Sequence, residues 1–159
     1  MSKKGKTPAA TPARTSSRSA PWRIHFFQRH AKEDANRSVP GRVFLLACPE
    51  KVRAMMLAVL KAVAEAPPPM FAGGGKWEAM HGDMNGFYEV RVDGPSRHHY
   101  RLFCVLEHDD GKLGLGGPSV VIICGKDKPF RTTLAEKDYA GVRVLGAEYK
   151  SRTPRSLAP

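Results

Sequence analysis

The sequence predicts an α+β protein with a small, mostly antiparallel twisted sheet and helices packed on one face of that sheet. Three patterns indicate this class. Residues 87–107 alternate apolar and polar side chains on either side of a turn signal, as two paired strands do. Residues 49–65 carry apolar residues at helical spacing, and residues 119–124 form the unbroken apolar run typical of a buried strand. A length of 159 residues suits one domain with tails.

Residues 1–22 are predicted to be a disordered basic tail. They consist mainly of Ser, Thr, Pro, Ala, Lys and Arg and contain no acid. Such a segment buries too little apolar surface to offset the entropy of ordering it. Two roles stay open: an electrostatic arm for RNA or DNA, and a solvated tail without a dedicated function. A single domain is predicted for residues 23–150, followed by a C-terminal tail at 151–159.

The first half of the domain predicts a strand and a helix. Residues 23–28 have the composition of a short strand, Pro40-Gly41 is a turn signal, and residues 43–47 suit either a short strand or the start of a helix. The helix predicted at 49–65 has one apolar stripe, and Pro67–Pro69 is expected to end it. The stripe consists of Val52, Met55, Met56, Val59, Leu60 and Val63.

The predicted hairpin has one apolar and one charged face. In its first strand Tyr88, Val90 and Val92 alternate with Glu89, Arg91 and Asp93. Asp93-Gly94-Pro95-Ser96 has turn chemistry. In the second strand His99 and Arg101 share a parity opposite to that of Tyr100, Leu102 and Cys104. A sheet packed on helices, with its polar side open to an anion, is expected.

The second half continues with a glycine-containing loop at 108–118, a buried strand at 119–124 and a basic loop at 125–131. Thr133-Leu134-Ala135-Glu136 matches a capping box, so a helix is predicted to begin near Leu134. The apolar stripe of this helix consists of Tyr139, Val142, Leu145 and Tyr149.

Composition narrows the class of partner. The net charge of +11 favours a polyanion, and nucleic acid comes before a membrane surface because no segment is apolar enough to span one. Cys48, Cys104 and Cys124 lie far apart in apolar runs, which fits neither a disulfide framework nor a zinc site. Buried, reduced thiols in a cytoplasmic protein are predicted, with no metal and no cofactor.

The stretch from about Pro49 to Lys150 resembles the RelE/ParE superfamily, the toxins of type II toxin-antitoxin systems, and its phage-derived, HigB-like branch in particular. The resemblance rests on AEAPPPMFAGGGKWEAMHG, then on the hairpin FYEVRV…HHYRLFCVL, then on a hydrophobic strand closed by a Gly-Lys loop and a C-terminal helix. It covers roughly two-thirds of the chain. It implies a short sheet with helices on one face.

The resemblance implies two activities. One branch cleaves mRNA, usually on the ribosome, with basic residues that project from the sheet; the other inhibits DNA gyrase and cleaves nothing. Both are neutralised by a cognate antitoxin protein. The leading hypothesis is a cytoplasmic, metal-independent mRNA endoribonuclease, and the alternatives are a gyrase inhibitor and a non-toxic nucleic-acid or protein binding module.

Catalytic residues are expected on the hairpin. Arg91 and Arg101 match basic positions of the cleaving branch and would clamp phosphate. His98 and His99 point to opposite faces, and parity places His99 with Arg101 as a proton shuttle. The non-catalytic alternatives are that these side chains are simply solvated, or that Arg91 forms an ion pair with Glu89 or Asp93. Glu89 stands where some ribosome-dependent members have a lysine, so it would repel phosphate or act as a general base.

Further RNA or phosphate contacts are expected outside the hairpin strands. Lys126, Lys128 and Arg131 lie where the cleaving branch carries another cation. His81 resembles the loop histidine of HigB-like enzymes in its placement. For each of these residues an inert, solvated side chain is the alternative.

Overall fold

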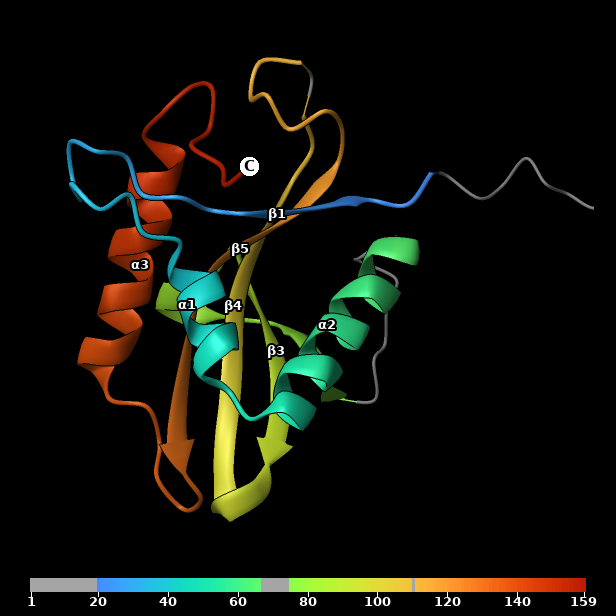
Figure 1. The fold of residues 1–159 in the computed structure, drawn as a ribbon, viewed down its shortest axis with the longest axis vertical. Coiled ribbons are helices and arrows are strands. Elements are labelled where there is room, and N and C mark those ends of the chain that lie inside the picture. The colour runs from blue at the N-terminus through green and yellow to red at the C-terminus, as the bar shows by residue number, and fades with distance from the viewer. Residues whose placement is uncertain (1–19, 67–74, 110) are drawn as a thin grey trace, which may run out of the picture.

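The computed structural model describes residues 20–66, 75–109 and 111–159. Within them the predicted α+β class is confirmed, with helices and one mostly antiparallel sheet (Figure 1). None of the described helices is both long and apolar enough to cross a membrane. The elements in chain order are β1 (Arg23–Phe26), α1 (Pro40–Ala47), α2 (Glu50–Glu65), β2 (Trp77–Ala79), the 3-10 turn η4 (Gly82–Met84), β3 (Phe87–Gly94), the 3-10 turn η5 (Pro95–Arg97), β4 (His98–Glu107), β5 (Ser119–Pro129) and α3 (Glu136–Lys150).

The sheet has five strands in the order β1-β5-β4-β3-β2. The expected hairpin is β3 and β4, with Phe87 opposite Val105 and Gly94 opposite His98. β5 runs antiparallel to β4 over its whole length, whereas β1 joins the far side of β5 in parallel. Residues 77–79, for which the sequence analysis predicts no strand, form the edge strand β2 beside β3. The hairpin therefore lies between two neighbours that the local pattern alone does not specify.

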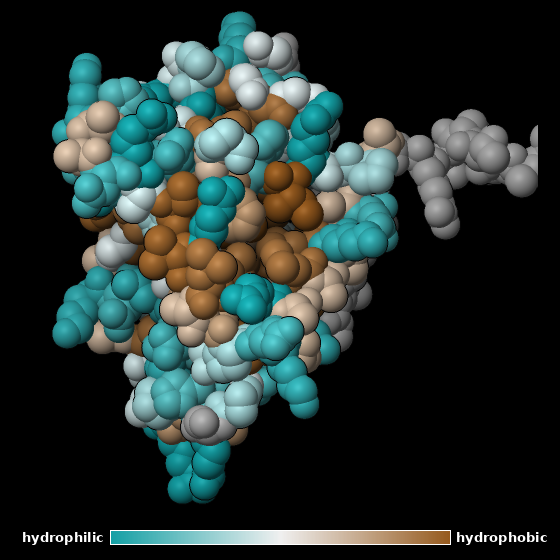
Figure 2. All heavy atoms as spheres, viewed as in Figure 1, coloured by the Kyte–Doolittle hydropathy of each residue, from teal (hydrophilic) through white to brown (hydrophobic). Residues whose placement is uncertain are grey.

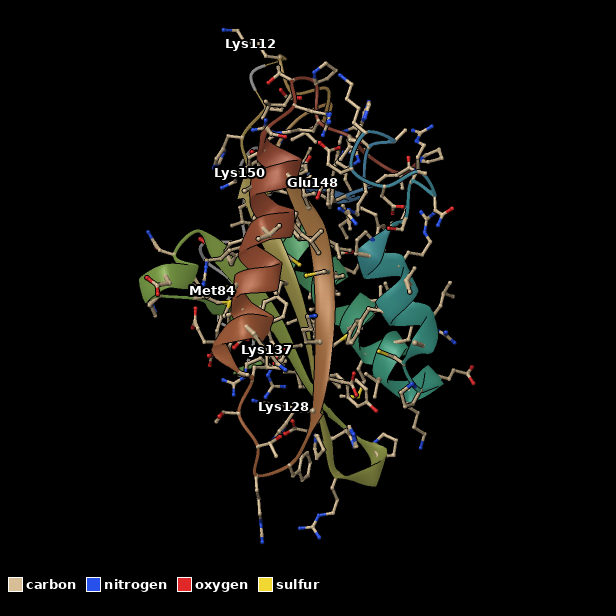
Figure 3. All side chains as sticks on the ribbon, turned by 90° about the vertical axis from the view of Figure 1, so that its left-hand side faces the viewer. Met84, Lys112, Lys128, Lys137, Glu148 and Lys150 are labelled. Atoms are coloured by element: carbon tan, nitrogen blue, oxygen red, sulfur yellow. The ribbon has the colours of Figure 1, made fainter. Side chains whose placement is uncertain are left out.

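Helices cover both faces of the sheet, which corrects the expectation that they share one face. α1 and α2 lie on one side and α3 on the other, as the edge-on view shows (Figures 1 and 3). Leu102 belongs to the core beneath α1 and α2, and its neighbour Phe103 belongs to the core beneath α3, both fully buried. Because β4 and β5 are apolar at consecutive positions, each of their faces needs a cover.

Two glycines allow helices to approach the sheet closely. A Cβ on Gly41 would lie 2.5 Å from Ile122 Cγ2, and one on Gly146 would lie 2.5 Å from Phe87 Cζ. Pro40-Gly41, predicted to be a turn, instead begins α1, because proline suits the first helical position and Gly41 fits against β5. Residues 43–47 are therefore helical.

The two long helices appear close to where the sequence places them. α2 begins at Glu50 with Pro49 as its N-cap, while the expected stop at Pro67–Pro69 lies outside the described residues. α3 begins at Glu136 instead of Leu134, because the Ala135 N–H donates to Asp138 Oδ2 at 3.0 Å and the Thr133 side chain is not the cap. Its predicted apolar stripe packs on the sheet.

Residues 151–159, predicted to be a tail, lie against the sheet. Leu157 forms an antiparallel bridge with Phe27, and the Ala158 N–H donates to the Phe26 oxygen at 2.9 Å. Arg155 binds the Glu107 carboxylate of β4. This segment therefore contributes to one end of the fold, near β1 (Figure 1). At the other terminus, residues 1–19 of the predicted basic tail lie outside the described residues.

The prediction of buried thiols is confirmed. Cys48, Cys104 and Cys124 are all free and buried. Burial raises the pKa of the Cys48 thiol to about 11 and that of Cys124 to about 12, so neither is ionised near neutral pH.

Candidate nucleic-acid interface

Cross-strand pairing brings five of the seven predicted site residues onto one face of the sheet. Residues directly opposite each other in paired strands project on the same side. Two rows result: Arg91–Arg101–Lys126 and Asp93–His99–Lys128. His98 falls on the other face, with its Nε2 3.9 Å from Asp127 Oδ2, as strand parity predicted.

These rows occupy the end of the face that α3 leaves open. The Tyr139 ring of α3 lies 6.3 Å from the Phe103 ring of β4, and Phe103 is two residues along β4 from Arg101. Beyond this point β5 continues to Pro129 past the start of the helix, and Figure 3 labels Lys128 there, below Lys137. α3 therefore borders the rows without covering them.

Arg101 is the most buried cation of the site, at 7% exposure. Its Nη1 donates to the Tyr100 oxygen at 3.0 Å, and the same nitrogen lies 3.8 Å from Asp93 Oδ1. Burial and the neighbouring Arg91 lower the pKa of Arg101 from its usual value. A positive charge held this far out of water interacts strongly with an anion that reaches the site.

Arg91 is paired with two carboxylates. Its Nη1 lies 2.9 Å from Glu78 Oε2 on β2, and its Nε lies 3.6 Å from Glu89 Oε1. The alternative in which Arg91 pairs with Glu89 is therefore observed, and Glu78 is a partner that the sequence analysis missed. A cavity of about 480 Å³ opens beside these residues, and Arg91, Asp93 and Arg101 are among the residues that line it.

His99 is oriented by Asp93. Its Nδ1 lies 2.5 Å from Asp93 Oδ1 across the hairpin, and this hydrogen bond is the main cause that lowers the pKa of Asp93. The Phe130 ring packs against the imidazole with 4.4 Å between centroids. The two contacts fix the ring plane and commit Nδ1 to the carboxylate.

Glu89 lies among the cations of the site. Burial raises the pKa of its carboxyl, while Arg91, Arg101 and Lys128 pull that pKa down. Burial, followed by Arg101, lowers the pKa of Lys128, and burial, followed by Glu89, raises the pKa of Tyr139. We call these five residues the Glu89 cluster. They form one group of interacting side chains where the sheet meets the start of α3.

Two predicted residues lie outside the two rows. His81 is exposed just before η4, past the end of β3 where the Met80 N–H donates to Phe87. Phe87 is four residues from Arg91 and six from Asp93, which is about 13 Å and about 20 Å along a strand. Arg131 is exposed beyond the end of β5 with a φ of +67°, next to Phe130. The structure thus separates His81 from the rows and leaves Arg131 at their outer end.

The charge of the site is mixed. Glu78, Glu89 and Asp93 offset most of the charge of Arg91, Arg101, Lys126 and Lys128, so the face is less cationic than strand parity suggested. Among the residues that the structure describes, no group of three or more His, Cys, Asp and Glu is placed to hold a metal ion. The chemistry offered by these side chains is anion binding together with acid–base transfer.

Sequence reasoning missed some members of the site. Glu78 was hidden because residues 77–79 have no strand pattern of their own. Tyr139 was assigned to the core, and it lies at the border between the core and the Glu89 cluster. The pairing of Asp93 with His99 has a local signal, since both flank one short turn at equal distance from its centre.

Comparisons with known proteins identify no family for this chain. No protein-family model matches the chain, and no curated protein matches it. Among solved structures, a chain in the crystal structure of the toxin–antitoxin complex RelBE2 from Mycobacterium tuberculosis is similar, with a TM-score of 0.41 and 15% sequence identity. The match covers 69% of this chain and 93% of that chain. A likeness of this size transfers no activity, partner or site residue to the present protein.

Proposed function

We propose that this protein is a metal-independent endoribonuclease that cleaves mRNA, with the ribosome as the place of action, and that it is the toxin of a toxin-antitoxin pair. The observation that carries the proposal is the Glu89 cluster together with the His99–Asp93 pair on the same face of the sheet. A partly buried carboxyl with a raised pKa stands among three cations, and an oriented histidine lies beyond the Arg91–Arg101 row. Cleavage of an RNA phosphodiester without a metal needs a base, an acid and fixed positive charge.

Each group has a role in this chemistry. The Glu89 carboxylate takes the proton of a 2′-hydroxyl, whose oxygen forms a bond to phosphorus. The bond from phosphorus to the 5′-oxygen breaks, and that oxygen receives a proton from the His99 imidazolium. The products are a 2′,3′-cyclic phosphate and a 5′-hydroxyl. A carboxyl whose pKa is raised by burial is a stronger base than one in water.

The cations stabilise the charge that develops on phosphate. Arg101 and Lys128 supply fixed charge from β4 and β5. Arg91 is held by Glu78, whose side chain is 47% exposed. A phosphate that enters the site exchanges with this exposed carboxylate, and a bidentate contact with Arg91 follows. Tyr139 lies near enough to Glu89 for the two groups to interact, and it borders the site on the α3 side.

The proposed antitoxin partner is supported by the opposite face. Val43 and Leu46 of α1 are 61% and 66% exposed, and Leu57 of α2 is 45% exposed. Figure 2 shows hydrophobic residues gathered in the middle of the side that carries α1 and α2. Apolar groups collected in this way are typical of protein interaction surfaces. Co-expression with the product of a neighbouring small open reading frame should relieve growth arrest, and Leu46→Lys should prevent this relief.

One observation favours the second candidate, a gyrase inhibitor without catalysis. Both Arg91 and His99 are engaged by acids in the free protein. A protein that blocks its target by binding alone does not need to release these pairs.

The test is translation in vitro with purified components, followed by primer extension on the mRNA. The wild type is compared with Arg101→Met, His99→Gln and the control Lys61→Ala, which removes an exposed charge on α2. We expect discrete mRNA ends with the wild type and the control, only when ribosomes are present, and their loss in the two site variants. Intact mRNA together with inhibition of gyrase supercoiling would favour the second candidate and refute the nuclease.

A further inference from the structure

We infer that a separate subsite at the tip of the sheet binds an unpaired base of the RNA by stacking on Phe130, with Arg97 and Arg131 holding the adjoining phosphates. This inference rests on the proposed function and names a contact that the catalytic residues do not make. A hollow of about 340 Å³ lies at this tip, and it is lined by Arg97, Pro129, Phe130 and Arg131. We call it the tip pocket.

The tip pocket is built from two loops that the fold brings together. Arg97 ends η5, between β3 and β4, and Phe130 follows β5 directly. The Phe130 N–H donates to the Arg97 oxygen at 2.7 Å, so the loops are tied through their backbones. In Figure 1 both loops lie at the same end of the sheet, below the start of α3.

The backbone at both arginines is strained. Arg97 has a φ of +57° and Arg131 a φ of +67°, in the left-handed region where Gly and Asn are the favoured residues. Strain of this kind persists where the surrounding structure enforces it, and it is concentrated in binding sites. Two arginines in such positions, on either side of one aromatic residue, present their side chains in a defined direction at a cost in stability.

The charges of the tip pocket are open to a ligand. Both arginines are exposed, and within the described part of the chain no carboxylate lies within 4.0 Å of either one. This contrasts with Arg91, whose charge is shared with Glu78 and Glu89. An incoming phosphate therefore meets cations at the tip without displacing an acid.

Phe130 links the tip pocket to the catalytic face. Its ring packs against His99 at 4.4 Å and also lines the hollow. Flat aromatic rings beside cations are the usual platform for single-stranded nucleic acid, because every base has a face that stacks. A base on Phe130 would place its neighbouring phosphate near His99, which is where the proposed reaction needs it.

Binding of a non-cleavable RNA tests this inference. The probe is a short, labelled single-stranded RNA with 2′-O-methyl groups, compared with an oligomer of the same phosphates in which every base is absent. Phe130→Ala should weaken binding of the RNA roughly 5- to 150-fold and leave the abasic oligomer almost unaffected. Phe130→Tyr should recover most of the affinity, and Phe130→Leu, which keeps the apolar packing on His99, should not.

Substitution of Arg97 and Arg131 should have a different effect from substitution of Phe130. Arg97→Asn and Arg131→Asn should each raise the melting temperature, because Asn tolerates the left-handed conformation. Each should also weaken both probes and lower the salt dependence of log K by about 0.7. A purely structural role for these arginines would give the stability gain without the loss of binding.

The outcomes separate the two proposals. Equal loss of both probes in Phe130→Ala, or no loss in either, would overturn the stacking subsite while leaving the nuclease standing if mRNA is still cleaved. Absence of RNA binding by the wild type would overturn both. Lys61→Ala controls for the removal of one positive charge elsewhere on the surface.

Discussion

The two ends of the sheet face that carries α3 hold similar side chains in different surroundings. At the closed end, Tyr149 donates to Glu107 Oε2 at 2.5 Å and Arg155 Nη2 binds Glu107 Oε1 at 3.0 Å, with the side chains of Arg155 and Glu107 only 12% and 10% exposed. At the open end, Arg101 lies 3.8 Å from an Asp93 carboxylate that is 61% exposed. Both ends therefore place an arginine opposite an acid.

The two arginines differ in how many hydrogen bonds and ion pairs each makes within the protein. Arg155 also donates to the Lys150 and Arg152 oxygens and lies over the Tyr149 ring, so its bonds hold the C-terminal segment to β4. Arg101 is as deeply placed, but among the described residues its side chain donates one hydrogen bond, to the Tyr100 oxygen. Removal of one partner from a satisfied buried pair destabilises a fold because it leaves an uncompensated charge, whereas a buried charge with few partners is available to a ligand.

The largest expected effect is at the closed end. Arg155→Met leaves the Glu107 carboxylate buried without its cation, so the free energy of unfolding should fall by about 3 kcal/mol. Urea denaturation measures this, and RNA binding should be unchanged. Arg143→Met is the matched control, because its partner Glu136 is 72% exposed and a surface pair contributes less than about 1 kcal/mol. Equal losses in the two variants would remove the distinction between the two ends.

The same substitution at the open end should act on function. Arg101→Met replaces a desolvated charge with an apolar chain of similar length, so unfolding free energy should stay within about 1 kcal/mol of wild type or rise. The rate of mRNA cleavage should fall about 100-fold or more, as when one charge-stabilising donor is removed from an active site. Denaturation and primer extension on the same preparation measure both. A large loss of stability would assign Arg101 to the fold.

The contact of α3 with the sheet offers an intermediate effect. Gly146→Ala places a methyl group 2.5 Å from the Phe87 ring, so α3 must shift, at a cost of about 2 kcal/mol. Gly141→Ala is the control, since nothing lies within 4 Å of its added Cβ and the helix gains propensity. Thermal melts should therefore move in opposite directions for the two variants. A melting temperature for Gly146→Ala at or above that of the wild type would show that α3 packs on the sheet less tightly than the 2.5 Å contact implies.

Release of Arg91 should have a smaller effect. Glu78→Gln removes the closest carboxylate of Arg91, so affinity for the non-cleavable RNA should rise by up to about 5-fold, the equivalent of one surface ion pair. The increase should shrink at high salt. Weaker binding would mean that Glu78 positions Arg91 for RNA instead of competing with it.

The smallest effect concerns how the contributions of Glu89 and Asp93 to stability depend on pH. The folded-state pKa of Glu89 is raised by burial, so its ionisation destabilises the fold. This loss of unfolding free energy is complete above the pKa of Glu89 in the folded protein. It disappears as the pH falls below the pKa of Glu89 in the unfolded chain. Glu89→Gln should therefore be the more stable protein at neutral pH, and the gap should close in acid. Denaturation over a pH series measures it, and an unchanged gap would contradict the burial argument.

Asp93 has the opposite sign. Its hydrogen bond with His99 lowers its folded pKa, so the stability it contributes is present above its unfolded pKa and is lost as the pH falls through the folded value. Cleavage should therefore fail on the acid side first through protonation of Glu89, while the Asp93–His99 pair is still intact. If Asp93→Asn shifts the pH at which the cleavage rate first falls on the acid side, this order is wrong.

Elements with a local signal could be predicted from the amino-acid pattern alone. The hairpin with its two faces, the α3 stripe, the burial of the cysteines and the α2 stripe follow from the spacing of apolar residues, because side-chain geometry converts that spacing into a face. Met55 is the exception in the α2 stripe, since it is 39% exposed at the edge of the buried face. The same parity placed His99 with Arg101 and separated it from His98. These features need no knowledge of which strands are neighbours.

Tertiary structure decided everything that depends on pairing between distant segments. The register of β5 on β4 aligns Lys126 with Arg101 and Lys128 with His99, and β2 delivers Glu78 to Arg91. No local pattern specifies these neighbours, because a strand pairs with whichever edge its own apolar face and its connections allow. For the same reason the sequence misplaced α3 on the face of α1 and α2 and took residues 151–159 for a tail.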